Sequence, residues 1–198
     1  VLFDGDGRAD PAQRIRAGEI AEMLGLELSL RASDEETDQV ASERTRDFLA
    51  QIGDTMEPSQ IHGVQELMAG WIALGGSLDF GRSDEISCFF VARGEDRSLG
   101  LQGIWPVTIY PKARTVEVVF QYLKDRPPFD SLLLREQLMS RLNEVPGIDL
   151  DSSRIEQRPS FSASVIANLV DRERVLEVLA WFLDQVRAHD AELRDVAG

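Results

Sequence analysis

Three runs of strand-forming residues lie close together between Ile86 and Leu123, and they constrain the fold more than any other feature. Turn-forming residues separate the runs, which are short enough to be neighbouring strands. All three are rich in β-branched and aromatic residues, and they cover positions 86–92, 104–110 and 115–123. This pattern is typical of the middle of an antiparallel sheet.

Helical periodicity surrounds these runs. Helices are predicted over 11–24 and from Ser33 to about Ile52, where Gly53 ends the second of them, and a linker is expected over 54–58. Further apolar stripes follow Ser59 and Asp130, the predicted caps of two more helices, and a last helix is predicted from about Asp171. We therefore predict an α+β fold, in which an antiparallel sheet of three to five strands packs against helices and follows an N-terminal helical hairpin. The expected division is an N-terminal helical segment over 1–58, an α+β domain over 59–190 and a frayed tail over 191–198.

The third run predicts how the sheet is covered. Its alternating residues give one clear core face, which carries Val116 and Val118, and one partly solvated face, which carries Glu117. We expect helices on the core face, and either the hairpin or a second subunit over part of the other. Pro106 predicts that the second run is an edge strand or contains a bulge, because proline cannot donate a backbone hydrogen bond.

The chain of 198 residues is strongly acidic, with a formal net charge of −14. This charge repels phosphate and argues against tight non-specific binding of nucleic acid, although it leaves a local basic patch possible. No apolar run is long enough to span a membrane and no secretory signal is present, so we expect a cytoplasmic protein. Because the chain does not begin with Met, we expect a fragment or a processed product, whose missing part could carry chemistry.

Motifs of enzymes and metal sites are missing from the sequence. It contains no E-x-K, G-x-x-x-x-G-K-[ST], H-E-x-x-H, C-x-x-C or G-x-S-x-G. The single cysteine, Cys88, lies within the first strand-like run and is interpreted as a buried hydrophobe, and His62 and His189 as surface residues. The acidic, glycine-containing segment 1–10 matches a calcium loop incompletely, and a terminal turn capped by Asp10 explains it better. We predict no catalytic residue, metal or cofactor.

Aromatic and arginine side chains are the candidates for binding, because these residue types dominate interaction hot spots. For each of them the alternative is that it fills the core. The candidates are Trp105, Tyr122, Lys124, Arg126, Phe129 and Arg158, with Tyr110 and Phe161 as further aromatic candidates. Several lie at the exit of the third run, 124–129, which is where we expect a working surface.

The C-terminal part of the chain resembles a bacterial α+β accessory domain associated with restriction and anti-phage defence proteins. The residues that carry this resemblance lie at 116–130, 135–138, 141–149, 158–161 and 178–182, and the resemblance covers about 70–186. It offers no catalytic motif to transfer. It implies an accessory, binding or regulatory role beside an effector protein.

Two functional hypotheses remain open. The first is an interaction or regulatory module that binds a protein partner or itself, and it predicts an exposed apolar or aromatic patch on the sheet. The second is a protein that acts on nucleic acid, because Gly18–Leu26 resembles the start of a helix-turn-helix unit. It predicts DNA contacts by the hairpin over 17–50, an arginine-lined groove or three converging carboxylates. The acidic start of the second helix and the net charge favour the first.

Overall fold

A computed structural model describes the backbone of residues 35–96 and 100–197. The predicted helix over 11–24, and with it the first half of the hairpin, lies outside the described residues, as does the calcium-like segment. The helices are α2 (Glu35–Thr55), α3 (Pro58–Ala73), α4 (Phe120–Leu123), α5 (Leu132–Asn143), η1 (Ser152–Arg154, a 3-10 helix), α6 (Ser164–Ala167) and α7 (Leu169–Ala197). The strands are β1 (Ser77–Phe80), β2 (Cys88–Val91), β3 (Val107–Tyr110), β4 (Thr115–Val118) and β5 (Ser160–Ser162).

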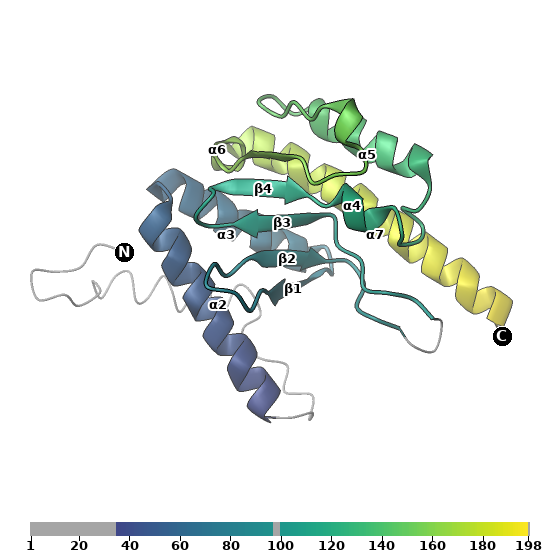
Figure 1. Ribbon diagram of the computed structural model, residues 1–198, viewed down its shortest axis with the longest axis horizontal. Coiled ribbons are helices and arrows are strands. Elements are labelled where there is room, and N and C mark those ends of the chain that lie inside the picture. The colour runs from purple at the N-terminus through teal and green to yellow at the C-terminus, as the bar shows by residue number, and fades with distance from the viewer. Residues whose placement is uncertain (1–34, 97–99, 198) are drawn as a thin grey trace, which may run out of the picture.

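The five strands form one antiparallel sheet in the order β1-β2-β3-β4-β5, so each strand pairs with its neighbours in the chain (Figure 1). Residues 81–87, 92–106 and 111–114 connect the first four strands, and the segment containing α4, α5 and η1 separates β4 from β5. The predicted α+β class and antiparallel sheet are confirmed.

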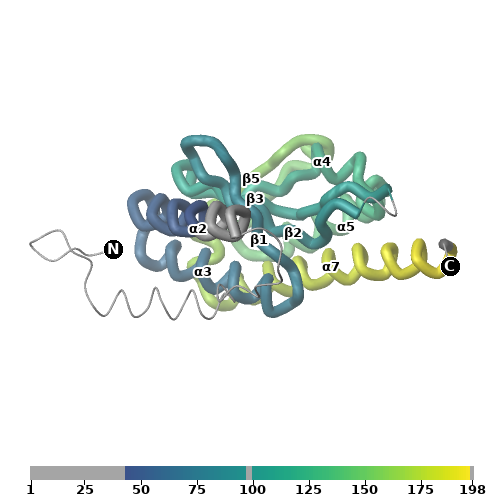
Figure 2. Tube along the Cα trace, turned by 90° about the horizontal axis from the view of Figure 1, so that it is seen from below, coloured from purple at the N-terminus to yellow at the C-terminus, as the bar shows by residue number. Residues whose placement is uncertain are grey.

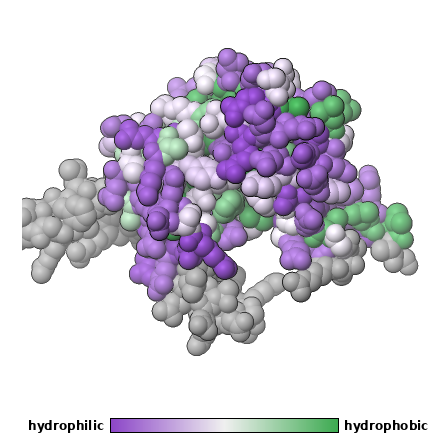
Figure 3. All heavy atoms as spheres, in the orientation of Figure 1, coloured by the Kyte–Doolittle hydropathy of each residue, from purple (hydrophilic) through white to green (hydrophobic). Residues whose placement is uncertain are grey.

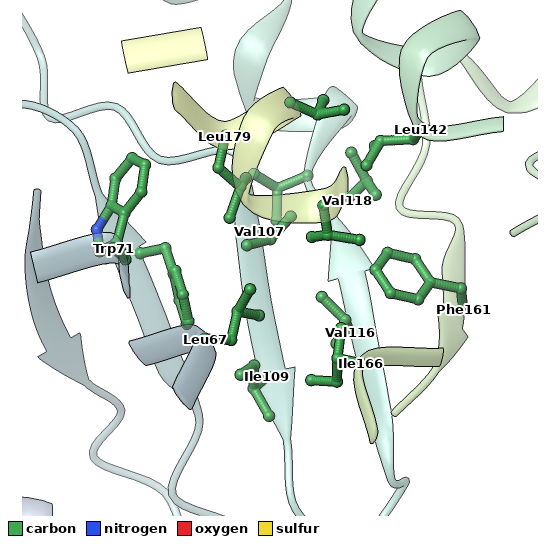
Figure 4. Packing of buried hydrophobic residues seen from close by; sticks show 14 of the residues in the cluster. Leu67, Trp71, Val107, Ile109, Val116, Val118, Leu142, Phe161, Ile166 and Leu179 are labelled. Atoms are coloured by element: carbon green, nitrogen blue, oxygen red, sulfur yellow. The ribbon is translucent and has the colours of Figure 1, made fainter. Parts of the chain in front are cut away.

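Helices α3 and α7 lie on one side of the sheet, and the two views show a strand layer over a helix layer (Figures 1 and 2). Between the layers lies the core, where Leu67 and Trp71 of α3 meet Val107 and Ile109 of β3 (Figure 4). The predicted helices on the core face are therefore confirmed. That the hairpin or a second subunit covers part of the other face stays a prediction.

Helix α2 packs onto this body, as expected for the second helix of the hairpin. Phe48 and Ile52 are fully buried in the same core cluster as the sheet residues. The helix continues past Gly53, which was predicted to end it, because Thr55 keeps the last turn in place by donating to the carbonyls of Gln51 (2.6 Å) and Pro111 (3.0 Å).

The start of α3 also differs from its prediction. Glu57 is the N-cap, Pro58 is the first helical residue, and Gln60 completes a capping box with Glu57. Ser59, the predicted cap, is therefore already inside the helix. The linker expected over 54–58 is reduced to two residues, because α2 ends at Thr55 and α3 begins at Pro58.

The third strand-like run is a strand for only part of its length. Strand β4 ends at Val118, and Val119 (φ −94°, ψ 46°) turns the chain into the short helix α4. Phe120 and Leu123 are both fully buried, and residues three apart lie on one side of a helix but on opposite faces of a strand. Core packing therefore favours the helical turn, and the prediction of one strand through 123 was wrong.

Pro106 does not mark an edge strand. Strand β3 is interior to the sheet and begins one residue after the proline, so every donor that its ladders need is present. The Pro106 carbonyl accepts a hydrogen bond from the Val119 amide (3.1 Å), which ties the start of β3 to the end of β4.

Two C-terminal helices differ from their predicted limits. Ser131 is the N-cap residue of α5 in place of Asp130, and α7 begins at Leu169 and continues to Ala197, through the segment predicted to be frayed. Arg93 and Asp190 form an ion pair whose side chains are both 9% exposed, and this pair anchors the distal part of α7 to the end of the β2 strand. None of the described helices is long and apolar enough to cross a membrane.

Candidate binding site

One row of side chains crosses the open face of the sheet. The strand register pairs Asp79 with Phe89, Phe89 with Thr108 and Thr108 with Glu117, so these four residues lie side by side on β1 to β4. The residues before and after each of these four positions point toward the core, because side chains alternate along a strand. The open face is thus aromatic and polar by the same alternation that makes the other face apolar.

The row forms part of a pocket with a volume of about 540 Å³, which we call the sheet-face pocket. This volume lies within the range of known ligand pockets, about 300–1,000 Å³. The pocket is lined by Asp79, Phe89, Val91, Gly94, Glu95, Gly103, Trp105, Thr108, Tyr110, Glu117, Val119, Tyr122 and Arg158. It therefore combines residues of four strands with the turn of α4 and the segment before β5.

Aromatic rings form one side of the sheet-face pocket. Trp105 lies edge-on to Phe89 (5.7 Å between ring centroids) and tilted against Tyr122 (5.6 Å). The Arg126 guanidinium lies over both Trp105 (5.0 Å) and Tyr122 (5.4 Å). Arg126 is fixed there because it donates to the carbonyls of Gly103 (2.8 Å) and Tyr122 (2.7 Å). The aromatic side is consequently held rigidly, with little side-chain freedom left to lose on binding.

Arg158 is the polar centre of the sheet-face pocket. Its Nε donates to Glu117 Oε1 (2.6 Å), its Nη2 to the hydroxyl of Tyr110 (2.8 Å) and its Nη1 to that of Tyr122 (3.4 Å). The bond with Glu117 is the main reason that the pKa of the Arg158 guanidinium is raised. Arg158 therefore stays charged and holds both tyrosines and Glu117 in one network.

Two buried polar atoms in the lining lack hydrogen-bond partners among the described residues, namely Trp105 Nε1 and Thr108 Oγ1. Thr108 is only 1% exposed. An unpaired polar atom in a buried position is costly, and both atoms are almost completely shielded from solvent, so they lie beneath the surface of the pocket.

Burial and charge act on the titratable groups at this face. The pKa of Tyr110 is raised, first by burial and then by the negative charge of Glu117, while Arg158 works in the opposite direction. Beneath the face, burial raises the pKa of the Cys88 thiol well above its ordinary value, with a smaller contribution from Asp79. Cys88 is fully buried, which confirms its interpretation as a core residue.

The structure brings together four of the six predicted binding residues: Trp105, Tyr122, Arg126 and Arg158. Lys124 is exposed just after α4 and is not among the lining residues. That these residues bind a partner stays a prediction.

Phe129, a predicted binding residue, does not lie on the binding surface. It is fully buried and stacks on Phe182 of α7 at 4.1 Å, so it belongs to the core. The further candidate Phe161 is also a core residue, 5% exposed. In both cases the alternative of core filling is correct. Tyr110, in contrast, lines the sheet-face pocket.

Sequence reasoning missed Phe89, Thr108 and Asp79, and it set Glu117 aside as an isolated carboxylate. The signal that could have found them is the period-two alternation of the first three strands, since each residue lies between two core positions. Which strands pair, and in which register, is not visible in that pattern.

Within the described residues, no group of three or more His, Cys, Asp or Glu side chains is placed to hold a metal ion. His62 is exposed on α3 and His189 is half-buried on α7. Comparisons with protein-family models, with curated proteins and with solved structures found no match to the chain.

Proposed function

We propose that this chain is a non-catalytic interaction module, which holds a peptide segment of a protein partner in the sheet-face pocket. The observation that carries the proposal is the pocket itself, which four aromatic rings and a networked arginine line together on the open face of the sheet. Aromatic residues and arginine are the side chains that most often dominate protein interfaces.

The surroundings of the sheet-face pocket suit such an interface. Figure 3 shows this side of the molecule as mostly hydrophilic or intermediate in hydropathy, with hydrophobic residues confined to small areas. A partner that binds here meets an aromatic centre with a polar rim, which is the usual anatomy of a non-obligate interface. This supports binding of a separate partner more than a permanent dimer, whose interface is more apolar.

A regulatory role beside an effector is the form of this function that we favour. Its support is the resemblance of residues 70–186 to an accessory domain of restriction and anti-phage defence proteins. A cytoplasmic location is part of the same proposal.

The alternative, action on nucleic acid, has less support. Three carboxylates and one arginine line the sheet-face pocket, and the chain carries a net charge of −14. The excess of carboxylates in the lining and the net negative charge of the chain both repel phosphate. A hairpin that reads DNA would read it with its second helix, which corresponds to α2, while its first helix, predicted over 11–24, lies outside the described residues.

Selection from a phage-displayed library of random peptides tests the proposed function. We expect the full chain to enrich peptides, and Trp105→Ala and Arg158→Ala to lose them, because these changes remove the aromatic side and the polar centre of the pocket. Arg154→Ala is the matched control, since Arg154 is exposed on η1 and outside the lining residues.

Circular dichroism and urea unfolding establish that each variant is folded before its selection is scored. Enrichment that is unchanged in folded Trp105→Ala and Arg158→Ala would place binding elsewhere and contradict the proposal. A complete failure of the wild-type chain to enrich peptides would contradict it as well.

A further inference from the structure

The chemistry of the sheet-face pocket narrows the kind of peptide that it accepts. We infer that its ligand is a proline-rich segment flanked by a basic residue, an inference that rests on the proposed function. Three properties of the pocket lead to this ligand: its hydrogen-bond donors, its negative charge and its aromatic side.

The first property is an excess of hydrogen-bond donors. A guanidinium can only donate, so the hydroxyl oxygens of Tyr110 and Tyr122 accept from Arg158, and each phenol keeps its own hydrogen to donate. The indole N–H of Trp105 and the Thr108 hydroxyl are shielded from solvent, so the two phenols are the donors that the pocket offers. A ligand that satisfies these phenols must bring acceptors.

The second property is the charge of the lining. Asp79, Glu95 and Glu117 are acidic. Two guanidinium groups lie beside them, Arg158 paired with Glu117 and Arg126 over the aromatic side. The acidic groups outnumber the basic ones, so an anionic acceptor such as a phosphate or carboxylate is disfavoured. Peptide carbonyls are strong acceptors without charge, so they fit the donors at no electrostatic penalty.

The third property is the aromatic side, which disfavours an ordinary peptide. Every residue except proline brings an N–H donor with each carbonyl, and a donor buried against aromatic rings without an acceptor is costly. Proline supplies the carbonyl without the N–H. Its ring also packs on aromatic faces, and the polyproline II helix is largely preformed, so little entropy is lost on binding.

The basic flank follows from the position of Asp79. This residue is exposed on β1, the first strand of the sheet, and lies at the margin of the pocket. An arginine or lysine next to the prolines would reach it, and the net charge of −14 attracts a basic segment from a distance. A cationic side chain alone does not explain the site, because it would leave the phenol donors of Tyr110 and Tyr122 unpaired.

Calorimetric titration of the full chain with synthetic peptides tests this ligand class. The probe is a short polyproline peptide with an arginine at each end. One control peptide has alanine in place of every proline, and another has glutamate in place of both arginines. We expect binding of the probe and a loss of about tenfold or more in affinity for each control.

Two tryptophan variants locate the binding. Trp105→Phe keeps an aromatic ring but reduces the aromatic surface on which proline rings pack, so we expect the probe to bind about three- to tenfold more weakly. Trp181→Phe is the matched control on α7, outside the lining residues, and its affinity should be unchanged. Tyr122→Phe, which removes one phenol donor from the lining, provides a second test if Trp105→Phe fails to fold.

Failure of this inference and failure of the proposed function give different results. If the alanine peptide binds as well as the probe, or if the peptides selected by the wild-type pocket lack proline, the ligand class is wrong and the proposed function stands. If the probe binds equally to wild type, Trp105→Phe and Tyr122→Phe, it binds elsewhere and the inference is overturned. If no selected peptide depends on the pocket, the proposed function itself fails.

Discussion

At the scale of single residues, Arg158 has the largest structural role at the open face. It bonds Glu117, Tyr110 and Tyr122, and its guanidinium lies 5.6 Å from the Tyr122 ring centroid. Its side chain is 33% exposed and that of Glu117 is 16% exposed, so solvent screens part of the attraction. The pair should therefore contribute measurably but modestly to stability.

We expect Arg158→Met to lower the free energy of unfolding by about 1 kcal/mol, because a partly buried Glu117 loses its partner. Urea denaturation measures the change, and the double variant with Glu117→Gln should lose less than the sum of the two single variants. Arg174→Met is the control, since its contact with Asp171 is 3.8 Å long and exposed. Equal effects of the two arginine variants would show that the network contributes nothing beyond a surface pair.

Tyr110 gives a prediction that depends on pH. Burial and Glu117 raise its pKa, so Tyr110 should ionise above the usual tyrosine value of about 10 in the folded protein and near it after unfolding. The native state then holds its proton more tightly, and the stability contribution is full below pH ~10 and lost as pH rises through the folded pKa.

Ultraviolet titration of Tyr122→Phe isolates Tyr110, because the chain has only two tyrosines. Adding Arg158→Met should raise the Tyr110 pKa further, since the positive charge lowers it. The same titration with Arg154→Met should not change. A Tyr110 pKa at or below about 10 in the folded protein would contradict the described burial.

At the scale of elements, the contact between α3 and α6 is set by one small residue. A Cβ added to Gly63 would lie 2.4 Å from the carbonyl oxygen of Ile166 and 2.9 Å from the amide nitrogen of Ala167. Both are backbone atoms, which cannot rotate away as a flexible side chain can. The absence of a side chain at Gly63 is what permits the close approach of the two helices.

Gly63→Ala should therefore destabilise the protein by about 1–3 kcal/mol, the usual cost of overpacking. The direction of the stability change is informative, because a Gly-to-Ala substitution at an exposed helix position stabilises the helix by about 1 kcal/mol. Gly94→Ala is the control, since its added Cβ meets nothing within 4 Å. Thermal unfolding of both variants measures the difference, and a Gly63→Ala protein as stable as wild type would refute the packing described.

At the scale of the whole molecule, the net charge of −14 leads to opposite expectations for the two functional hypotheses. We expect the mass of the full chain in solution, measured by light scattering, to be unchanged by a short DNA duplex at moderate salt, because long-range repulsion opposes encounter. A complex whose affinity falls steeply with salt would instead show a phosphate-binding surface and favour action on nucleic acid. The same measurement without DNA reports self-association.

The sequence by itself determined which segments are apolar and with what period, and so the α+β class, the three central strands and the helices after 59, 130 and 171. It also indicated that Trp105, Tyr122, Arg126 and Arg158 merit attention, because residue type alone suggests hot spots. These are local properties, which follow from side-chain chemistry and from the two backbone periods.

Only the tertiary structure decided which of these residues meet. Phe129 and Arg126 are three residues apart, yet one is in the core and the other covers Trp105, because the chain turns into α4 where packing of Phe120 and Leu123 outweighs their strand propensity. The sheet-face pocket depends on the register that sets Asp79, Phe89, Thr108 and Glu117 in one row. Register is a relation between distant segments, and a linear pattern leaves it open.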